Sequence, residues 1–175
     1  EIEPGTSPQV TYDQAKAAEL LDQAGWKLVP GKKIRERDGS PLVIDLCFTG
    51  NDAAHKAIAE VLQAQGLAVG LSFNLLGEEP DSFLRRQKEG DFGLIVNPTW
   101  GPPSEPRAMI SSMLLPSHAD FMAQSGLPMK GEIDEKIRQV LISTDEAGRV
   151  EYYRWILTTL HEQAVYLPIC HVALL

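Results

Sequence analysis

The sequence predicts an α/β fold in which a short, mainly parallel sheet is flanked by helices. Apolar residues alternate over residues 42–48 and 67–75, and a further apolar run covers 92–96. Segments with helical periodicity lie between these runs, and Gly and Pro residues mark the boundaries. Because strands and helices alternate through this region, we expect parallel strands joined by right-handed crossovers.

A helix is expected before the first strand. Thr11 and Gln14 have the spacing of a capping box, in which each side chain bonds the other residue's backbone N–H. Gly25 stands where a C-terminal cap belongs. Apolar residues follow at helical spacing between these ends, at Ala17, Leu20, Leu21 and Ala24.

Two helices are expected between the strands. The first covers Asp52 to Gln65 and stops at Gly66, after which Leu67 begins the second strand. The other is short and is opened by Pro80, because proline is tolerated in the first turn of a helix. Its mixed-charge face is expected to point to solvent and contains Asp81, Arg85, Arg86, Lys88 and Glu89.

The second half of the chain is less regular. Residues 100–128 are rich in Pro, Gly, Ser and Met and predict a long loop region that could hold a short helix. Loops of this length are often functional. A helix follows over 133–141, and the capping-box spacing of Ser143 and Glu146 predicts another. Residues 165–175 are expected to form a last strand, interrupted by Pro168.

Composition narrows the class of protein. The chain has 175 residues, of which 43% are hydrophobic, so 1–175 fits a single domain with a buried core. A net charge of -8 argues against nucleic-acid binding, and no apolar run approaches the roughly 20 residues that cross a bilayer. The polar start is not typical of a signal peptide. For Cys47 and Cys170, two buried thiols are favoured over a disulfide.

No enzyme motif is apparent. The sequence has no Gly-rich phosphate loop, no G-x-S-x-G, no H-E-x-x-H and no Cys-x-x-Cys pair, so we expect no enzyme activity. The histidines lack the i, i+4 pairing that builds a local metal site, so any metal would be held by few protein atoms. His55 and His161 are expected on helix surfaces, and His171 is expected to pack in the last strand.

Two residues of the irregular region are candidates for binding. His118 could offer a neutral imidazole nitrogen to Ni, Cu or Zn, or it could be a solvated loop residue. Trp100 follows the run 92–96, where a parallel sheet delivers its chain to the ligand-binding edge. Its ring could stack on a solute or pack in the core.

Several segments together resemble the large peptide, dipeptide and nickel solute-binding proteins of ABC importers. These segments are Tyr12–Ala17 running into Leu20–Trp26, then Asp91-Phe92-Gly93, and then Ser143–Glu146 leading to Tyr166–Ile169. The resemblance extends over nearly the whole chain. It implies a periplasmic-binding-protein-like lobe, with residues 1–175 forming one lobe and the N-terminal lobe absent.

Three stretches resemble the nickel-binding branch of that family, at 97–102, 111–113 and 116–120. The resemblance implies that His118 coordinates nickel and that Trp100 lines the ligand cleft. The remaining ligands would come mainly from a small organic chelator such as free histidine. Ser104, also at the ligand, departs from the branch, where a second cleft aromatic is expected.

The resemblance also implies partners and a location. The protein would deliver its ligand to permease subunits in the membrane, from the periplasm or from a lipid anchor on the outer face of the cytoplasmic membrane. Two alternatives stay open. One is a binding protein for dipeptides, oligopeptides or another small solute, and the other is an enzyme that uses His118 with Asp120 as a base.

Overall fold

The computed structural model describes residues 12–98 and 106–170, which belong to two compact units. We call residues 12–98 the sheet unit and residues 106–170 the helical unit. The sequence predicted one domain over 1–175, and that both units belong to one lobe of a larger protein stays a prediction. Each unit is described by itself.

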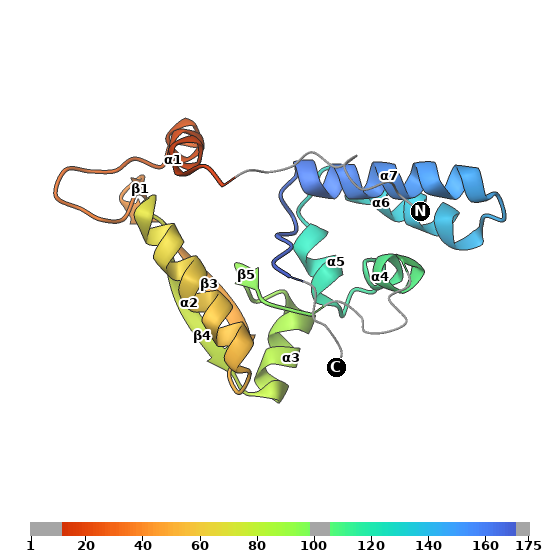
Figure 1. Ribbon diagram of the computed structural model, residues 1–175, viewed down its shortest axis with the longest axis horizontal. Coiled ribbons are helices and arrows are strands. Elements are labelled where there is room, and N and C mark those ends of the chain that lie inside the picture. Colours follow the sequence, from red (N-terminus) through yellow and green to blue (C-terminus); the bar gives the residue numbers. More distant parts are fainter. Residues whose placement is uncertain (1–11, 99–105, 171–175) are drawn as a thin grey trace. The chain divides into compact units, whose positions relative to one another are not determined.

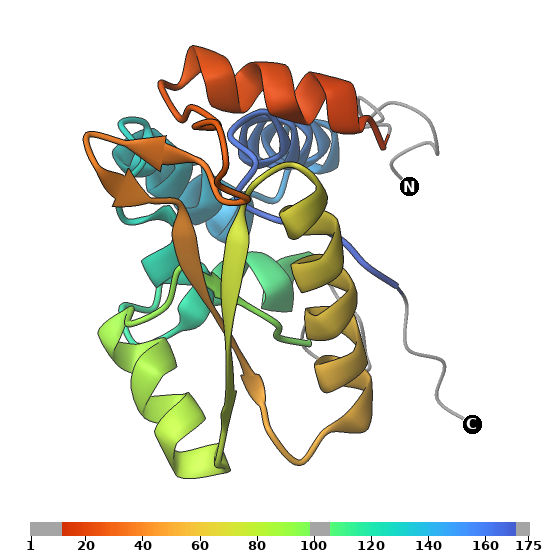
Figure 2. The ribbon, with the colours of Figure 1, turned by 90° about the vertical axis from the view of Figure 1, so that its left-hand side faces the viewer.

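The sheet unit is built on three parallel strands in the order β4-β3-β5 (Figure 2). The central strand β3 (Val43–Thr49) pairs along its whole length with β4 (Ser72–Glu78) and over two residues with β5 (Leu94–Ile95). Leu46 lies opposite Leu75 on one side and Leu94 on the other. The predicted parallel α/β arrangement is confirmed.

Helices flank this sheet. Helix α2 (Ala53–Ala68) packs along β3 and β4, and α3 (Pro80–Glu89) contacts the same two strands (Figure 1). Asp52 caps α2 by accepting hydrogen bonds from two backbone N–H groups of its first turn. The fully buried centre of the sheet unit contains Leu46, Phe48 and Ala59, and partly buried apolar residues surround it, namely Leu62, Phe73, Leu75, Leu94 and Val96.

The end of α2 differs from the prediction. The helix does not stop at Gly66 but continues to Ala68, and the chain leaves it through Gly70, whose φ of 83° is in the left-handed region. Gly66 has a packing role, because a Cβ there would come within 2.9 Å of the Phe73 ring. The strand therefore begins at Ser72, five residues later than predicted.

The N-terminal part of the sheet unit begins with α1 (Gln14–Gln23). Its N-cap is Asp13, which accepts a hydrogen bond from the Lys16 backbone, and Thr11 lies outside the described residues. Arg35, only 5% exposed, donates to Asp22 at 2.9 Å and to the Val69 carbonyl at 2.7 Å, and so links the end of α1 to the end of α2. The hydrogen bond from Arg35 lowers the pKa of the Asp22 carboxyl group.

A small hairpin was missed by the sequence analysis. Strands β1 (Glu36–Arg37) and β2 (Ser40–Pro41) pair antiparallel across Asp38 and Gly39. Both turn residues have positive φ, 53° and 80°, which is the conformation that Asp-Gly favours in tight hairpins. The Asp-Gly pair was the available signal.

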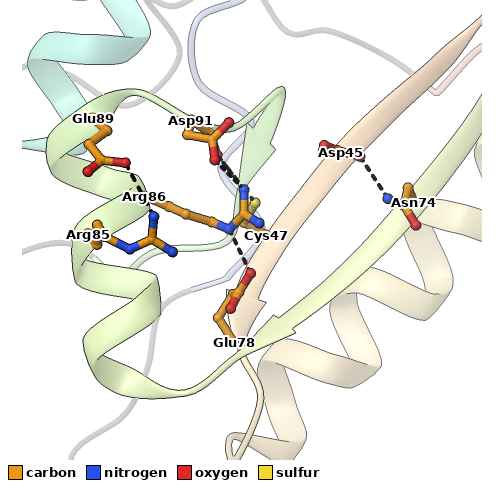
Figure 3. Close-up of polar contacts among 8 residues, drawn as sticks. All are labelled: Asp45, Cys47, Asn74, Glu78, Arg85, Arg86, Glu89 and Asp91. Carbon is orange, nitrogen blue, oxygen red and sulfur yellow. Dashed lines mark hydrogen bonds and ion pairs between the residues drawn. The ribbon is translucent and has the colours of Figure 1, made fainter.

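One residue of the charged face of α3 departs from the predicted exposure: the prediction is confirmed for Asp81, Arg85, Lys88 and Glu89 and wrong for Arg86. The side chain of Arg86 is 19% exposed and makes 2.6 Å contacts with both Glu78 and Asp91 (Figure 3). The hydrogen bond with Glu78 raises the pKa of Arg86. Arg86 therefore ties α3 to the end of β4 and to the turn before β5, whereas Arg85 and Glu89 form an exposed pair.

The helical unit contains α4 (Pro106–Ser112), α5 (Ala119–Gln124), α6 (Lys130–Ile142) and α7 (Glu146–Glu162). Helices α6 and α7 pack side by side, and α4 packs on α6 (Figure 1). The buried apolar core of this unit consists of Ile110, Met113, Ile133, Ile137, Val140, Ile156 and Leu160. Amphipathic helices around one core are the usual way to bury apolar faces without a sheet.

Three predictions for the helical unit need correction. The region 100–128, predicted as a long loop region that could hold one short helix, contains both α4 and α5 among its described residues. Ser143 ends α6, and Asp145 caps α7 because its carboxylate reaches the Ala147 N–H. Residues 165–170 form no strand, and Pro168 among them lacks the backbone donor that strand pairing uses. Residues 171–175 lie outside the described residues.

The two cysteines differ in environment. Both are free thiols, but Cys47 is buried on β3 whereas Cys170 is exposed. The prediction of a buried thiol is therefore correct for Cys47 and wrong for Cys170. Burial raises the pKa of the Cys47 thiol.

We expect only one of these thiols to react with a thiol-specific reagent in the folded 175-residue chain. The thiolate is the nucleophile, and Cys47 is both buried and harder to ionise. Cys170→Ser should remove the rapid reaction measured with Ellman's reagent, and Cys47→Ala should leave it intact. Rapid reaction of both thiols without denaturant would contradict the burial of Cys47.

Gly66→Ala should destabilise the sheet unit. The added methyl would meet Phe73 at 2.9 Å and the Leu71 carbonyl at 3.0 Å, so overpacking should exceed the gain in helix propensity by about 1–2 kcal/mol. Urea unfolding followed by circular dichroism measures this loss. Gly131→Ala is the matched control, because nothing lies within 4 Å of the new methyl in α6 and no loss is expected.

Candidate functional site

His118 lies at the N-terminal boundary of α5, not in an irregular loop. It is the N-cap residue, with extended backbone angles, and its imidazole makes no capping hydrogen bond. The residue is partly buried. Its side chain is therefore not committed to holding the first turn of the helix, as a Ser or Asp at the same position would be.

The backbone of His118 is held on both sides. Its N–H donates to the Leu115 carbonyl at 2.9 Å, and its carbonyl accepts from the Met122 N–H at 3.1 Å. The neighbouring Ala119 is 7% exposed, and Met113, before the turn, is fully buried. Ala119 and Met113 are buried on the two sides of His118. Together with the two backbone hydrogen bonds they fix the position of the His118 Cα.

A partly buried polar network begins two residues beyond His118. The Asp120 carboxylate accepts a 2.5 Å hydrogen bond from the Ser112 hydroxyl and a 3.1 Å bond from the Tyr166 hydroxyl. Tyr166 in turn accepts from the Gln124 amide at 2.9 Å. The network therefore joins the end of α4, both ends of α5 and the segment that follows α7.

A second set of contacts holds α5 from the side of α6. The Lys130 ammonium donates to the Met113 carbonyl at 2.9 Å and pairs with Asp134 at 2.5 Å. The same ammonium lies 4.5 Å from the centre of the Phe121 ring, a cation–π distance. Lys130 thus contacts the residues on both sides of the turn that carries His118.

The other predicted site residues lie in different places. Trp100 and Ser104 fall outside the described residues. His55 on α2 and His161 on α7 were both predicted on helix surfaces, and both are partly buried. The Nδ1 of His55 is buried and has no hydrogen-bond partner among the described residues. His171 is also outside the described residues. Over 12–98 and 106–170, no three His, Cys, Asp or Glu side chains are grouped to hold a metal.

Sequence reasoning missed the partners of Asp120. Ser112, Gln124 and Tyr166 are separated from one another along the chain by up to 54 positions in the numbering, and no motif joins them. The one available signal was the combination of polar residues with apolar neighbours in segments expected to be buried. That signal does not identify which polar groups meet.

Comparison with known proteins decides the family. The sequence profile of the bacterial extracellular solute-binding proteins, family 5 (middle region), matches residues 2–121. The chain belongs to this family. Family membership agrees with the resemblance seen in the sequence.

The most similar relatives include nickel-binding proteins. The chain is 50% identical over 164 residues to the nickel-binding periplasmic protein of Escherichia coli K12, covering 94% of this chain and 31% of that protein. The structure of NikA from Brucella suis in complex with Fe(III)-EDTA has a TM-score of 0.88 at 49% identity, covering 95% of this chain and 35% of that one.

More distant relatives share the fold. NikZ from Campylobacter jejuni, solved with Ni(L-His), has a TM-score of 0.75 at 19% identity, covering 93% of this chain and 33% of that one. The chain thus spans about a third of the length of these relatives. Within the described residues, no helix has both the length and the apolar character needed to span a membrane.

The hydroxyl of Tyr166 should stay protonated in the folded protein beyond its ordinary range. Burial, and then the charge of Asp120, raise its pKa, whereas the unfolded chain ionises near the usual value of about 10. The stability that Tyr166 contributes should be complete below about pH 10 and should fall above it.

Subtracting the alkaline absorbance titration of Tyr166→Phe from that of the unchanged protein isolates this group. We expect the difference to show phenolate only at a pH where the protein also unfolds. A difference curve that titrates near pH 10 with the fold intact would contradict the burial of this hydroxyl.

Proposed function

We propose that the protein containing this chain binds nickel as a complex with a small organic chelator and delivers it to an ABC importer. The observation that carries this proposal is the 50% identity, over 94% of the chain, to a nickel-binding periplasmic protein. The nickel is cargo, so binding must be tight enough to capture it and reversible enough to release it to the permease.

The chemistry of His118 supports a direct metal contact. Imidazole is a suitable ligand for nickel, and His118 is partly buried at a turn with both backbone groups bonded. A single protein ligand leaves most of the metal's coordination sphere to be filled. A chelator such as free histidine would fill it, and the Brucella suis relative was solved with a metal enclosed in a chelator.

Trp100 and Ser104 are proposed to contact the chelator. An indole ring gives a flat apolar surface on which an organic ligand can stack, and a serine in place of a second aromatic leaves room and adds a hydroxyl. The serine at position 104 would therefore alter which chelator fits. Neither residue belongs to the described part of the chain.

We propose that residues 1–175 form one lobe of a two-lobed protein. The chain spans about a third of its relatives, which leaves the N-terminal lobe and the other cleft wall to parts of the protein beyond these residues. Closure of the lobes over the ligand would retain the nickel, and opening at the permease would release it. The protein would work in the periplasm or from a lipid anchor on the outer face of the cytoplasmic membrane.

A second candidate is a dipeptide- or oligopeptide-binding protein. The dipeptide-binding protein of Escherichia coli K12 is 24% identical over 92% of this chain. In that case the backbone of the peptide would supply the main contacts, and His118 would have no metal. Binding of dipeptides without nickel distinguishes this candidate from the first.

The test is calorimetric titration of Ni(II), with and without free histidine, into the intact protein and into His118→Ala. We expect tight binding that requires the chelator and that falls at least about 100-fold in His118→Ala, because a direct metal ligand matters at least as much as the groups that orient one.

His161→Ala is the matched control, since it removes an imidazole from α7 in the same unit. We expect His161→Ala to bind nickel with free histidine as tightly as the unchanged protein does. Nickel binding that is indifferent to His118 would reject the proposed metal contact, and dipeptide binding in the absence of nickel would favour the second candidate.

A further inference from the structure

The hydrogen bonds that link Gln124, Tyr166 and Asp120 allow only one assignment of donors and acceptors. A carboxylate can only accept, so the one proton of the Tyr166 hydroxyl goes to Asp120. The Tyr166 oxygen must then accept from the Gln124 Nε2 group, which sets the orientation of that amide. Every proton in this chain of hydrogen bonds points toward Asp120.

The orientation of Gln124 has a cost. Its side chain is fully buried, and its Oε1 has no hydrogen-bond partner in the described part of the chain. Turning the amide round would satisfy Oε1 only if Tyr166 donated to it and left Asp120. The structure therefore keeps the bond between Tyr166 and the carboxylate and leaves a neutral oxygen unpaired, as expected when the bond to a charged group is the stronger.

The Ser112 hydroxyl also has one proton and two acceptors within reach. It lies 2.5 Å from Asp120 and 2.7 Å from the Met109 carbonyl. The shorter contact has the length expected of an O–H donor to a carboxylate. Asp120 is therefore held from α4 by Ser112 and from the chain after α7 by Tyr166.

Helix α5 needs such external support. It has six residues, and isolated helices below about 12–15 residues are marginal in water. Only Ala119 separates Asp120 from His118, and the His118 carbonyl accepts the Met122 N–H of the same helix. A rotation or shift of α5 must move His118 with it.

We propose that Asp120 and Tyr166 are positioning residues for His118: their hydrogen bond locks α5 so that the imidazole meets the nickel chelate at a set distance and angle. This inference rests on the proposed nickel function. It assigns a role in binding to two residues on different segments, neither of which would touch the ligand.

Three variants of the intact protein separate this role from general stability. Tyr166→Phe and Asp120→Ala remove the bond between the two residues. Asp120→Asn keeps it, because the new amide oxygen can accept from Tyr166 while its NH₂ donates to the Ser112 oxygen, whose proton then goes to Met109. Tyr152→Phe, on α7 of the same unit, is the matched control for losing a hydroxyl.

Each variant would be titrated with Ni(II) plus free histidine, and the absorption spectrum of the bound nickel would be recorded at saturation. The urea midpoint of the ligand-free protein is the third measurement. We expect Tyr166→Phe and Asp120→Ala to bind about 10-fold or more weakly and to shift the nickel spectrum, as supporting groups of metal ligands do. Asp120→Asn and Tyr152→Phe should keep both the affinity and the spectrum.

Wild-type affinity in Tyr166→Phe and Asp120→Ala would overturn the inference. So would a lower affinity with an unchanged spectrum, since that is the result of a purely structural role. An Asp120→Asn variant as impaired as Asp120→Ala would reject the hydrogen bond as the cause. If His118→Ala itself binds normally, the proposed function fails and this inference with it; a weak His118→Ala beside a normal Tyr166→Phe rejects the inference alone.

Discussion

The candidate site depends on the apolar core between α4, α6 and α7. Ile110 and Met113 lie in this core with residues of both long helices, and their burial fixes the end of α4. From that point the chain makes consecutive tight turns to His118. The backbone position of His118 is therefore set by side chains that have no chemical role, because burial of apolar area is the largest favourable term in folding.

Polar contacts then hold the turn around His118 and helix α5 against this apolar core. Asp120, within α5, accepts from Ser112 at the end of α4. Lys130, at the start of α6, contacts Phe121 of α5 and the Met113 carbonyl that precedes the turn. Partly buried polar contacts of this kind give an arrangement a definite geometry, since breaking one leaves a polar group without a partner where water has limited access. The proposed nickel site would depend on such contacts, because with one protein ligand no second ligand would fix the geometry of the first.

Much of the fold was predictable because its signals are local. Alternation of apolar residues identified β3, and Asp52 and Pro80 marked the starts of α2 and α3. The predictions that were wrong also have physical causes. Gly66 was read as a helix stop although its role is to let Phe73 approach, and Arg86 was read as a surface charge although Glu78 and Asp91 enclose it. Both depend on residues distant in sequence.

The sequence by itself determined the α/β class, the parallel order of strands and helices and the resemblance to the family, and it offered His118 as a candidate. Each of these follows from residue types at short spacing or from motifs that stay together along the chain. Only the tertiary structure decided that His118 begins a short helix and that Ser112, Asp120, Gln124 and Tyr166 meet beside it. The reason is that packing of α4, α5 and the chain after α7 brings those groups together, and no local pattern records which buried polar groups will share a hydrogen bond.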